Sequence, residues 1–213
     1  MFDVAVVGAG LAGLQTARLL ATRGLRVALI DRKRSLSEGI QTTGIFVRKT
    51  WEDFPLPDEQ LGPGIRDVVL YSPSLRSMAL TAARDEFRVG RMSWIYLYLL
   101  EQCSRLGVTW MPSTRVLECD PLHEHSRLTI ERGGHQERLH ARYVVGADGP
   151  RSKIAAALSL DRNREFLVGV EDVIEPPKDV GPSLHCFLDP RLAPGYIGWV
   201  VTDGEEAHAG VAG

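Results

Sequence analysis

The chain has 213 residues, 44% hydrophobic and 24% charged, a composition typical of a soluble globular protein with one large or two small domains. Its 25 basic and 27 acidic residues are well mixed and leave a net charge of −2, which argues against nucleic acid or an anionic membrane surface as a partner. Because no secretory pattern opens the chain and no apolar run reaches the ~18 residues of a membrane span, we expect a cytoplasmic protein.

The cysteines and histidines predict no metal site. Cys103, Cys119 and Cys186 are an odd number without CxxC spacing, which indicates reduced thiols that pack as small hydrophobic residues. The segment 123–125 reads His-Glu-His, but no further ligands surround it in sequence.

The strongest pattern stands at the N-terminus, where an apolar strand over 2–7 leads into a glycine turn and then into a helix. Gly8 permits the tight turn, Gly10 lets backbone approach a pyrophosphate, and Gly13 lets the helix pack on the strand. The free N–H groups and the dipole of the helix attract the anion. The predicted diphosphate site of an adenine dinucleotide comprises Gly8, Ala9, Gly10, Leu11, Ala12 and Gly13.

A second strand, over 26–30, ends on Asp31, at about the 20-residue spacing that dinucleotide sites use for their acidic residue. A carboxylate there accepts hydrogen bonds from a ribose 2′-OH and repels a 2′-phosphate. Arg32 and Lys33 follow directly, and two interpretations stay open: they lie over the adenine or its phosphates, or they are simply solvated.

Two different sequence patterns occupy the middle of the chain, first short strands and then a helix. Helical periodicity is absent from 35–88, where prolines and glycines separate short strands such as 68–71 and 78–80, so we expect an insertion that carries part of a second layer. A buried helix is predicted from Ser93 to 106, with the aromatic residues near its start, including Trp94, serving as packing.

Strands follow at 108–111, 116–119, 127–130 and 136–139, the last two joined as a hairpin through 132–134. Another strand, 143–145, leads into the segment 146–152, Gly-Ala-Asp-Gly-Pro-Arg-Ser, and a helix over 153–158. Asp148 is either a ligand contact or a cap of that helix. The last third alternates like half-buried antiparallel strands, at 166–170, 184–188, 196–201 and 207–211.

Together these motifs resemble the FAD-dependent oxidoreductases of the para-hydroxybenzoate hydroxylase fold, which include aromatic monooxygenases, flavin halogenases and geranylgeranyl reductases. The glycine turn with Asp31 resembles the ADP-ribose motif of that family, and 146–152 resembles its second flavin motif. The resemblance implies that Asp148, with Gly149, lies near the pyrophosphate and ribityl region. It also implies that Arg91 reaches the flavin diphosphate or ribityl chain and that the backbone of Val116 contacts adenine.

The resemblance implies an α/β fold: a Rossmann-like FAD-binding domain with a parallel sheet, helices and a β-meander, and a substrate domain built on an antiparallel sheet. We expect a discontinuous FAD-binding domain over 1–45 and 85–160 and a partial substrate domain over 46–84 and 161–213. Members of this fold carry a third flavin motif, Gly-Asp, in a later segment. We therefore expect a chain that is incomplete at its C-terminus.

Within that family, the segment 193–200, Ala-Pro-Gly-Tyr-Ile-Gly-Trp-Val, is similar to the geranylgeranyl reductase signature, although its spacing differs. The similarity implies that Tyr196 and Trp199 bind substrate; the alternative is that both are core aromatics of the sheet. The loop 41–44 lacks the cysteine found there in characterised reductases.

The expected activity is hydride transfer from reduced FAD to an isoprenoid double bond, with NAD(P)H as a transient reductant and the flavin carrying the chemistry. The first alternative is an FAD-dependent NAD(P)H monooxygenase, a hydroxylase or epoxidase, and the second is a non-catalytic flavin-binding fragment. The expected substrate is small and apolar or aromatic. No catalytic acid or base is assigned from the sequence, and the oligomeric state stays open.

Overall fold

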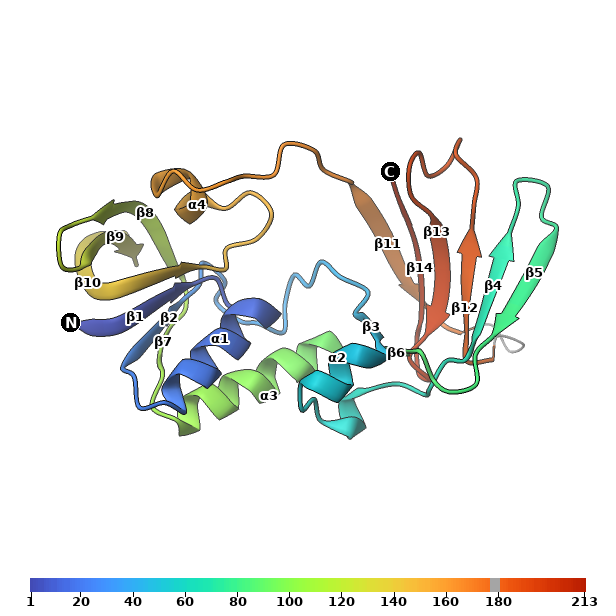
Figure 1. Cartoon of the computed structure of the whole chain (residues 1–213), viewed down its shortest axis with the longest axis horizontal. Helices are drawn as coiled ribbons and strands as arrows, with labels where there is room; N and C mark the ends of the chain where they lie inside the picture. Colours follow the sequence, from blue (N-terminus) through green and yellow to red (C-terminus); the bar gives the residue numbers. More distant parts are fainter. Residues whose placement is uncertain (177–180) are drawn as a thin grey trace. The chain divides into compact units, whose positions relative to one another are not determined.

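The computed structural model describes residues 1–176 and 181–213, which form two compact units (Figure 1). Unit 1 comprises Met1–Ile40 and Tyr96–Arg164, and unit 2 comprises Gln41–Ile95 and Glu165–Gly213. Within the described residues, no helix combines the length and the apolar character that a bilayer crossing requires.

Unit 1 is built on one sheet with the strand order β7-β2-β1-β10-β9-β8. The contacts of β1 with β2, of β2 with β7 and of β1 with β10 are parallel, whereas β8, β9 and β10 form an antiparallel meander. This confirms the predicted Rossmann-like sheet with a β-meander. The strands are β1 (Phe2–Val7), β2 (Val27–Ile30), β7 (Thr109–Met111), β8 (Thr114–Pro121), β9 (Ser126–Arg132) and β10 (His135–Gly146).

Helices α1 (Leu11–Ala21) and α4 (Lys153–Ala157) pack on this sheet, and the part of α3 (Met92–Arg105) from Tyr96 onward also belongs to unit 1. Helix α1 buries Gly13, Leu14 and Ala17, a stripe of small and apolar residues at helical spacing. The Cys103 thiol of α3 donates to the Leu14 carbonyl oxygen at 3.4 Å, so α1 and α3 lie side by side, as Figure 1 shows.

Strand β10 corrects the sequence analysis, which expected separate strands at 136–139 and 143–145. It is one strand of 12 residues whose first part pairs with β9 and whose last part pairs with β1. Between these two segments, His140 and Arg142 interrupt the apolar pattern without interrupting the ladder, and Ala141 is buried. The predicted hairpin is confirmed, because Gly133 and Gly134 adopt φ of +58° and +80° between β9 and β10.

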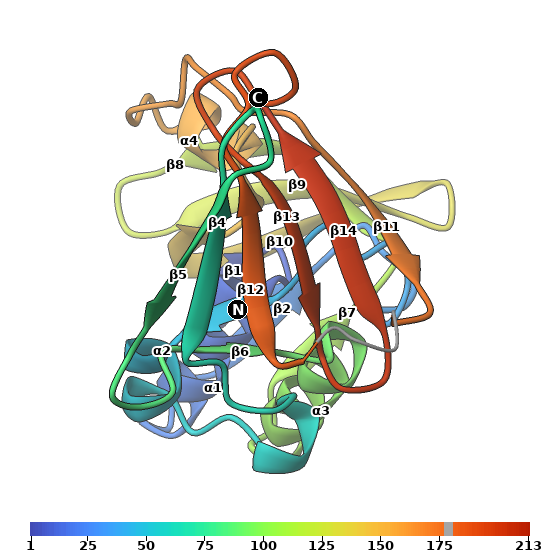
Figure 2. The same ribbon diagram turned by 90° about the vertical axis from the view of Figure 1, so that its right-hand side faces the viewer.

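Unit 2 is built on a second sheet with the order β11-β14-β13-β12-β4-β5, seen face-on in Figure 2. All neighbours in it are antiparallel except β4 and β12, which are parallel. A small sheet pairs β3 (Ile45–Val47) with β6 (Phe87–Val89). The strands of the larger sheet are β4 (Asp67–Tyr71), β5 (Ser77–Thr81), β11 (Gly169–Ile174), β12 (Ser183–Phe187), β13 (Gly198–Thr202) and β14 (Ala207–Ala212).

Three details of unit 2 differ from the expectation. The stretch 35–88 contains a short helix α2 (Arg48–Asp53) and a 3-10 turn η1 (Asp58–Gln60), where no helix was predicted. Strand β13 begins at Gly198, so Tyr196 lies in the turn before it. Trp94, expected to pack, is 59% exposed. Helix α2 has ion pairs of i,i+4 spacing rather than an apolar stripe, which is why its periodicity was invisible.

The three cysteines are free and buried, which confirms that they pack as small hydrophobic residues. Cys119 belongs to the core of unit 1, and Cys186 to the core of unit 2 together with Ile65, Leu184 and Val201. Burial raises the pKa of the Cys103 thiol to about 11 and also raises the pKa of the other two.

Candidate functional site

The two glycine-containing motifs meet at one edge of the sheet of unit 1. Strands β1 and β10 are parallel neighbours that end together, with Val7 opposite Gly146, and the Ala147 N–H donates to the Val7 carbonyl oxygen at 2.7 Å. Gly8 adopts φ of +101°, and a Cβ there would stand 2.2 Å from the Ala147 oxygen. Only glycine fits at this position, and the two motifs are in contact although the sequence separates them widely.

The three glycines of the N-terminal turn have different surroundings. A Cβ on Gly13 would lie 1.8 Å from the Gly8 oxygen, so its absence allows α1 to pack on the turn. A Cβ on Gly10 would meet no atom within 4 Å. Gly10 caps α1 without a side-chain hydrogen bond, and Leu11 and Ala12 follow in the first turn of the helix. An open glycine before uncapped helix amides is a cradle that fits a diphosphate.

The Asp31 carboxylate hydrogen-bonds to the backbone of the glycine turn. Its Oδ2 accepts from the Ala9 N–H at 2.7 Å, and its Oδ1 accepts from the Lys33 N–H, also at 2.7 Å. The carboxylate is thus held beside the turn by two backbone donors, and its remaining lone pairs are available for a ribose hydroxyl. The Lys33 ammonium donates to the Gly39 carbonyl oxygen at 3.0 Å, whereas Arg32 is exposed.

Asp148 caps α4. Its Oδ1 accepts from the Ser152 hydroxyl at 2.5 Å, and its Oδ2 accepts from the Lys153 and Ile154 N–H groups at 2.7 and 3.3 Å. Gly149 follows with φ of +88°, which turns the chain toward the helix. The capping interpretation of Asp148 is therefore present in the structure, and its contact with a cofactor stays a prediction.

Val116 lies on β8, half-buried against the core of unit 1. It stands opposite Ile130, but Glu118 is already opposite Thr129, so Leu117 is the extra residue of a β-bulge. A bulge leaves backbone groups out of the regular ladder. The structure thus places an irregular backbone at Val116, and its contact with adenine stays a prediction.

Arg91 immediately precedes α3 and belongs to unit 2. Its guanidinium faces two acids of the turn between β13 and β14: Nη2 lies 2.8 Å from Glu205 Oε1, and Nε lies 3.7 Å from Asp203 Oδ2. Nε is buried and has no hydrogen-bond partner within the described residues. In the structure Arg91 is thus an ion-pair partner of this turn, and its predicted contact with a diphosphate or ribityl chain is not tested.

The structure does not bring Tyr196 and Trp199 together on a strand. Tyr196 is 51% exposed in the turn before β13, whereas Trp199 is half-buried on the strand itself. The indole lies across Gly210 of β14, where a Cβ would be 2.3 Å from the ring. Its Nε1 donates to Thr43 Oγ1 at 3.1 Å and to Glu171 Oε2 at 3.2 Å.

Sequence reasoning missed the polar residues around this indole. Glu171 on β11 also accepts from the Thr43 hydroxyl, and its Oε1 lies 3.1 Å from His208 Nδ1 on β14. Strands β11, β14 and β13 bring Glu171, Gly210 and Trp199 into one row across the sheet. The available signal was a pair of acidic residues, Glu171 and Asp172, in an otherwise apolar strand at 169–174 and a histidine in another at 207–212. We call Thr43, Glu171, Trp199 and His208 the Glu171 cluster.

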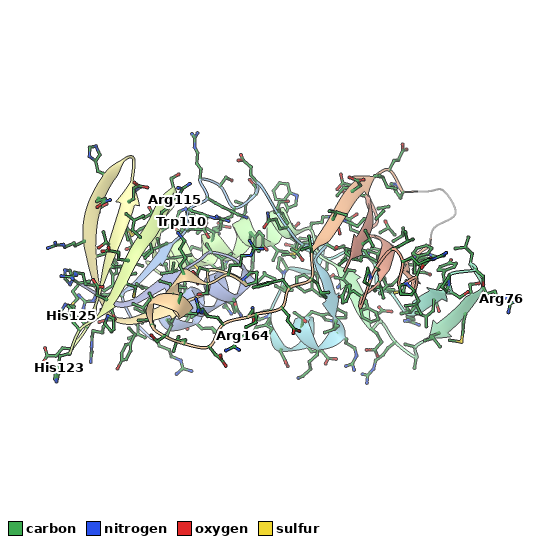
Figure 3. The ribbon with its side chains drawn as sticks, turned by 90° about the horizontal axis from the view of Figure 1, so that it is seen from above. Arg76, Trp110, Arg115, His123, His125 and Arg164 are labelled. Carbon is green, nitrogen blue, oxygen red and sulfur yellow. The ribbon has the colours of Figure 1, made fainter. Side chains whose placement is uncertain are left out.

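Figure 3 shows His123 and His125 at the tip of the β8–β9 turn. The His125 ring contacts the His140 ring with a centroid separation of 5.1 Å. Over 1–176 and 181–213, no group of three or more potential ligands has the arrangement of a metal site.

Comparisons with known proteins agree with this geometry. A family model described as FAD dependent oxidoreductase matches residues 3–89, and one described as FAD binding domain matches residues 94–189. The chain is 30% identical to the digeranylgeranylglycerophospholipid reductase of Haloferax volcanii, over 99% of this chain and 53% of that protein. The chain spans about half the length of the reductases among the curated relatives it matches.

Two solved structures share the fold. A geranylgeranyl bacteriochlorophyll reductase-like protein from Thermoplasma acidophilum superposes with a TM-score of 0.86 at 20% identity, over 99% of this chain and 56% of the other. A p-nitrophenol 4-monooxygenase from Pseudomonas putida gives a TM-score of 0.83 at 17% identity, over 100% of this chain and 58% of the other.

Proposed function

We propose, since this chain belongs to the FAD-dependent oxidoreductases, that unit 1 binds FAD and that unit 2 binds an apolar isoprenoid substrate whose double bond is reduced. Bound FAD supplies hydride chemistry. NAD(P)H is the proposed reductant. It would dock transiently, because the sequence has one recognised dinucleotide motif, the glycine turn of unit 1, and that motif is assigned to FAD. The protein contributes binding, orientation and the exclusion of water.

The observation that supports FAD binding is the open cradle at Gly10. Its backbone can approach a diphosphate closely, and the first amides of α1, which follow directly, have no side-chain cap. Asp31 would accept a hydrogen bond from the adenosine ribose while it keeps its two backbone donors. The proposed further contacts are the backbone of Val116 to adenine, and Arg91, Asp148 and Gly149 to the diphosphate and ribityl region.

The proposed substrate class rests on the similarity to the reductase of Haloferax volcanii and on Trp199. An indole whose N–H is fixed by hydrogen bonds offers a rigid apolar wall, which suits a long hydrocarbon chain. Tyr196 is exposed and free to contribute a second aromatic surface. The alternative function is an NAD(P)H-dependent hydroxylase or epoxidase, in line with the monooxygenase that shares the fold.

The first test is a fluorescence titration of FAD against the wild type and Asp31→Ala. We expect binding to weaken by roughly 1–3 kcal/mol, because a charge-assisted hydrogen bond to the ribose is lost. Glu124→Ala is the matched control, since it removes an exposed carboxylate of the same unit. Equal affinity of Asp31→Ala and the wild type would contradict the proposed ribose contact.

The second test separates reductase from monooxygenase. The FAD-loaded protein is reduced with NADH or NADPH under anaerobic conditions and mixed with geranylgeraniol. The expected result is flavin reoxidation together with a product in which one carbon–carbon double bond of the alcohol has been reduced to a single bond. Reoxidation that requires oxygen, with a hydroxylated or epoxidised product, would replace the reductase proposal by the alternative.

A further inference from the structure

The Glu171 cluster lies on the sheet face of unit 2 that also carries the core. Side chains alternate along a strand, and Trp199 stands opposite the buried Cys186 of β12. The side chains of Glu171 and His208 are 21% and 13% exposed. A carboxylate and an imidazole thus contact each other on a largely apolar face, where unpaired charge is costly.

With Glu171 ionised, donor and acceptor rules assign a direction to each contact in the cluster. An ionised carboxylate only accepts, and an indole N–H only donates. Glu171 Oε2 therefore accepts from Trp199 and Thr43, and Oε1 accepts from His208 Nδ1 at 3.1 Å. The imidazole hydrogen on Nδ1 points to the carboxylate, which leaves Nε2 as the atom that can gain or lose a proton. Within the described residues, no hydrogen bond occupies Nε2.

A second histidine of the same sheet provides a contrast. His185 Nδ1 lies 3.0 Å from the Tyr71 hydroxyl, and the two rings are stacked with a centroid separation of 5.8 Å. Strand alternation places His185 on the face opposite to Trp199, because His185 stands opposite Val200. His185 has a neutral hydroxyl partner, Tyr71, whose ring also stacks on it, whereas His208 has a carboxylate partner. Packing accounts for the first histidine and leaves the arrangement of the second unexplained.

We propose that His208 is the proton donor to the substrate, with Glu171 as the residue that positions it. The inference rests on the proposed reduction of a double bond, which needs a hydride and a proton. One alkene carbon receives the hydride that reduced flavin provides, and the other receives the proton from His208 Nε2. The π bond breaks and two C–H bonds form; the alkene gains the electron pair that the flavin loses. Neutral His208 then regains a proton from water.

The position beside Trp199 supports this role. The same carboxylate that orients His208 also holds the indole against which the hydrocarbon is proposed to lie. Proton donor and apolar wall are therefore fixed relative to each other by one side chain. Among the described residues, Glu171 is the titratable group that hydrogen-bonds to His208, and the other members of the cluster, Thr43 and Trp199, carry no charge.

The activity test uses prereduced, FAD-loaded protein and geranylgeraniol in single turnovers. We expect His208→Gln to slow flavin reoxidation by about 10²–10⁴-fold, the usual contribution of a positioned acid. FAD affinity and reduction by NAD(P)H should stay within twofold of the wild type. The wild-type rate should fall as pH rises, because the donor must carry a proton, and the residual rate of His208→Gln should not.

The matched controls are His185→Gln, which removes the histidine of the opposite face, and Asp172→Asn, which neutralises an exposed acid next to Glu171. Both should retain the wild-type rate. Glu171→Gln should slow reoxidation and alter the pH profile while FAD affinity is retained.

A second readout needs neither flavin nor turnover. Nitrogen-15 spectra of the histidine rings in the apoprotein should show neutral His208 as the Nδ1–H tautomer, and Glu171→Gln should release it to the usual Nε2–H form. An Nε2–H tautomer in the wild type would overturn the proposed positioning. A His208→Gln variant as fast as the wild type would overturn the proton donor while the proposed function stands. Failure of the wild type itself to reduce the alkene would overturn both.

Discussion

At the scale of single residues, the glycines of the N-terminal turn divide into structural and functional positions. Gly8 and Gly13 lie where a Cβ would collide with backbone atoms at 2.2 and 1.8 Å. Gly10 has open space around its missing side chain and is exposed. The first two are therefore required for the chain to fold locally, and the third leaves the space that the proposed diphosphate would use.

Substitution of these glycines by alanine should separate the two roles. Gly13→Ala should destabilise the protein by about 1–3 kcal/mol or more, because backbone must shift to admit the methyl group. Gly10→Ala should change the stability by no more than about 0.5 kcal/mol but weaken FAD binding, since the methyl group occupies the proposed diphosphate space. Thermal melts and FAD titrations of both variants test this. A Gly10→Ala variant that melts as low as Gly13→Ala would contradict the division.

At the scale of elements, polar contacts lie at the start of α4 and at the start of the paired strands β1 and β2. Asp148 and Ser152 satisfy the first amides of α4. Asp3 at the start of β1 accepts from the backbone N–H and the guanidinium of Arg26 just ahead of β2, at 2.8–3.1 Å. These contacts set where each element begins, which the apolar pattern alone does not define.

Asp148→Ala should cost about 1 kcal/mol of stability, the usual effect of a lost helix cap. Ser152→Ala removes the acceptor of the Ala155 N–H in the same helix and is the matched control. If Asp148 only caps α4, both variants should lower the melting temperature and leave FAD affinity unchanged. A loss of FAD affinity in Asp148→Ala beyond that in Ser152→Ala would establish the proposed cofactor contact.

The Asp3–Arg26 contact predicts an acid-sensitive stability. Hydrogen bonds from the Arg26 side chain and backbone lower the pKa of Asp3 from 3.8 to about 2. A lowered pKa stabilises the folded state above the unfolded value, and that contribution is lost as pH falls from about 4 toward 2. Asp3→Asn should therefore melt below the wild type at pH 6, with a difference that shrinks toward pH 2. A difference that is constant over this range would contradict the assignment.

At the scale of the whole molecule, the two units carry separate cores, and each core contains buried thiols. Cys103, Cys119 and Cys186 are 1%, 5% and 6% exposed. Burial raises the pKa of each, so thiolate is scarce in the folded protein at neutral pH. Reactivity of these thiols consequently reports the opening of the cores.

Thiol labelling should therefore follow unfolding. With Ellman's reagent at pH 8, the native protein should react slowly, and all three cysteines should react at once in concentrated urea. Cys186→Ser should remove the one thiol that reports unit 2, and Cys119→Ser should remove one of the two thiols that report unit 1, the other being Cys103. Rapid stoichiometric labelling of the native protein would show that the thiols are not buried in solution.

The sequence by itself determined the parts of this protein whose causes are local. A glycine turn between an apolar strand and a helix, followed by Asp31 after the next strand, depends on backbone sterics and spacing, which short segments encode. The hairpin at Gly133 and most strands of both sheets were predictable for the same reason.

Only the tertiary structure decided what depends on strand order. Parallel pairing of β1 and β10 brings Ala147 against Gly8, and pairing of β11, β14 and β13 brings Glu171 against Trp199 and His208. Such contacts join residues distant in sequence, and single side chains in apolar strands carry no local signal of their partners.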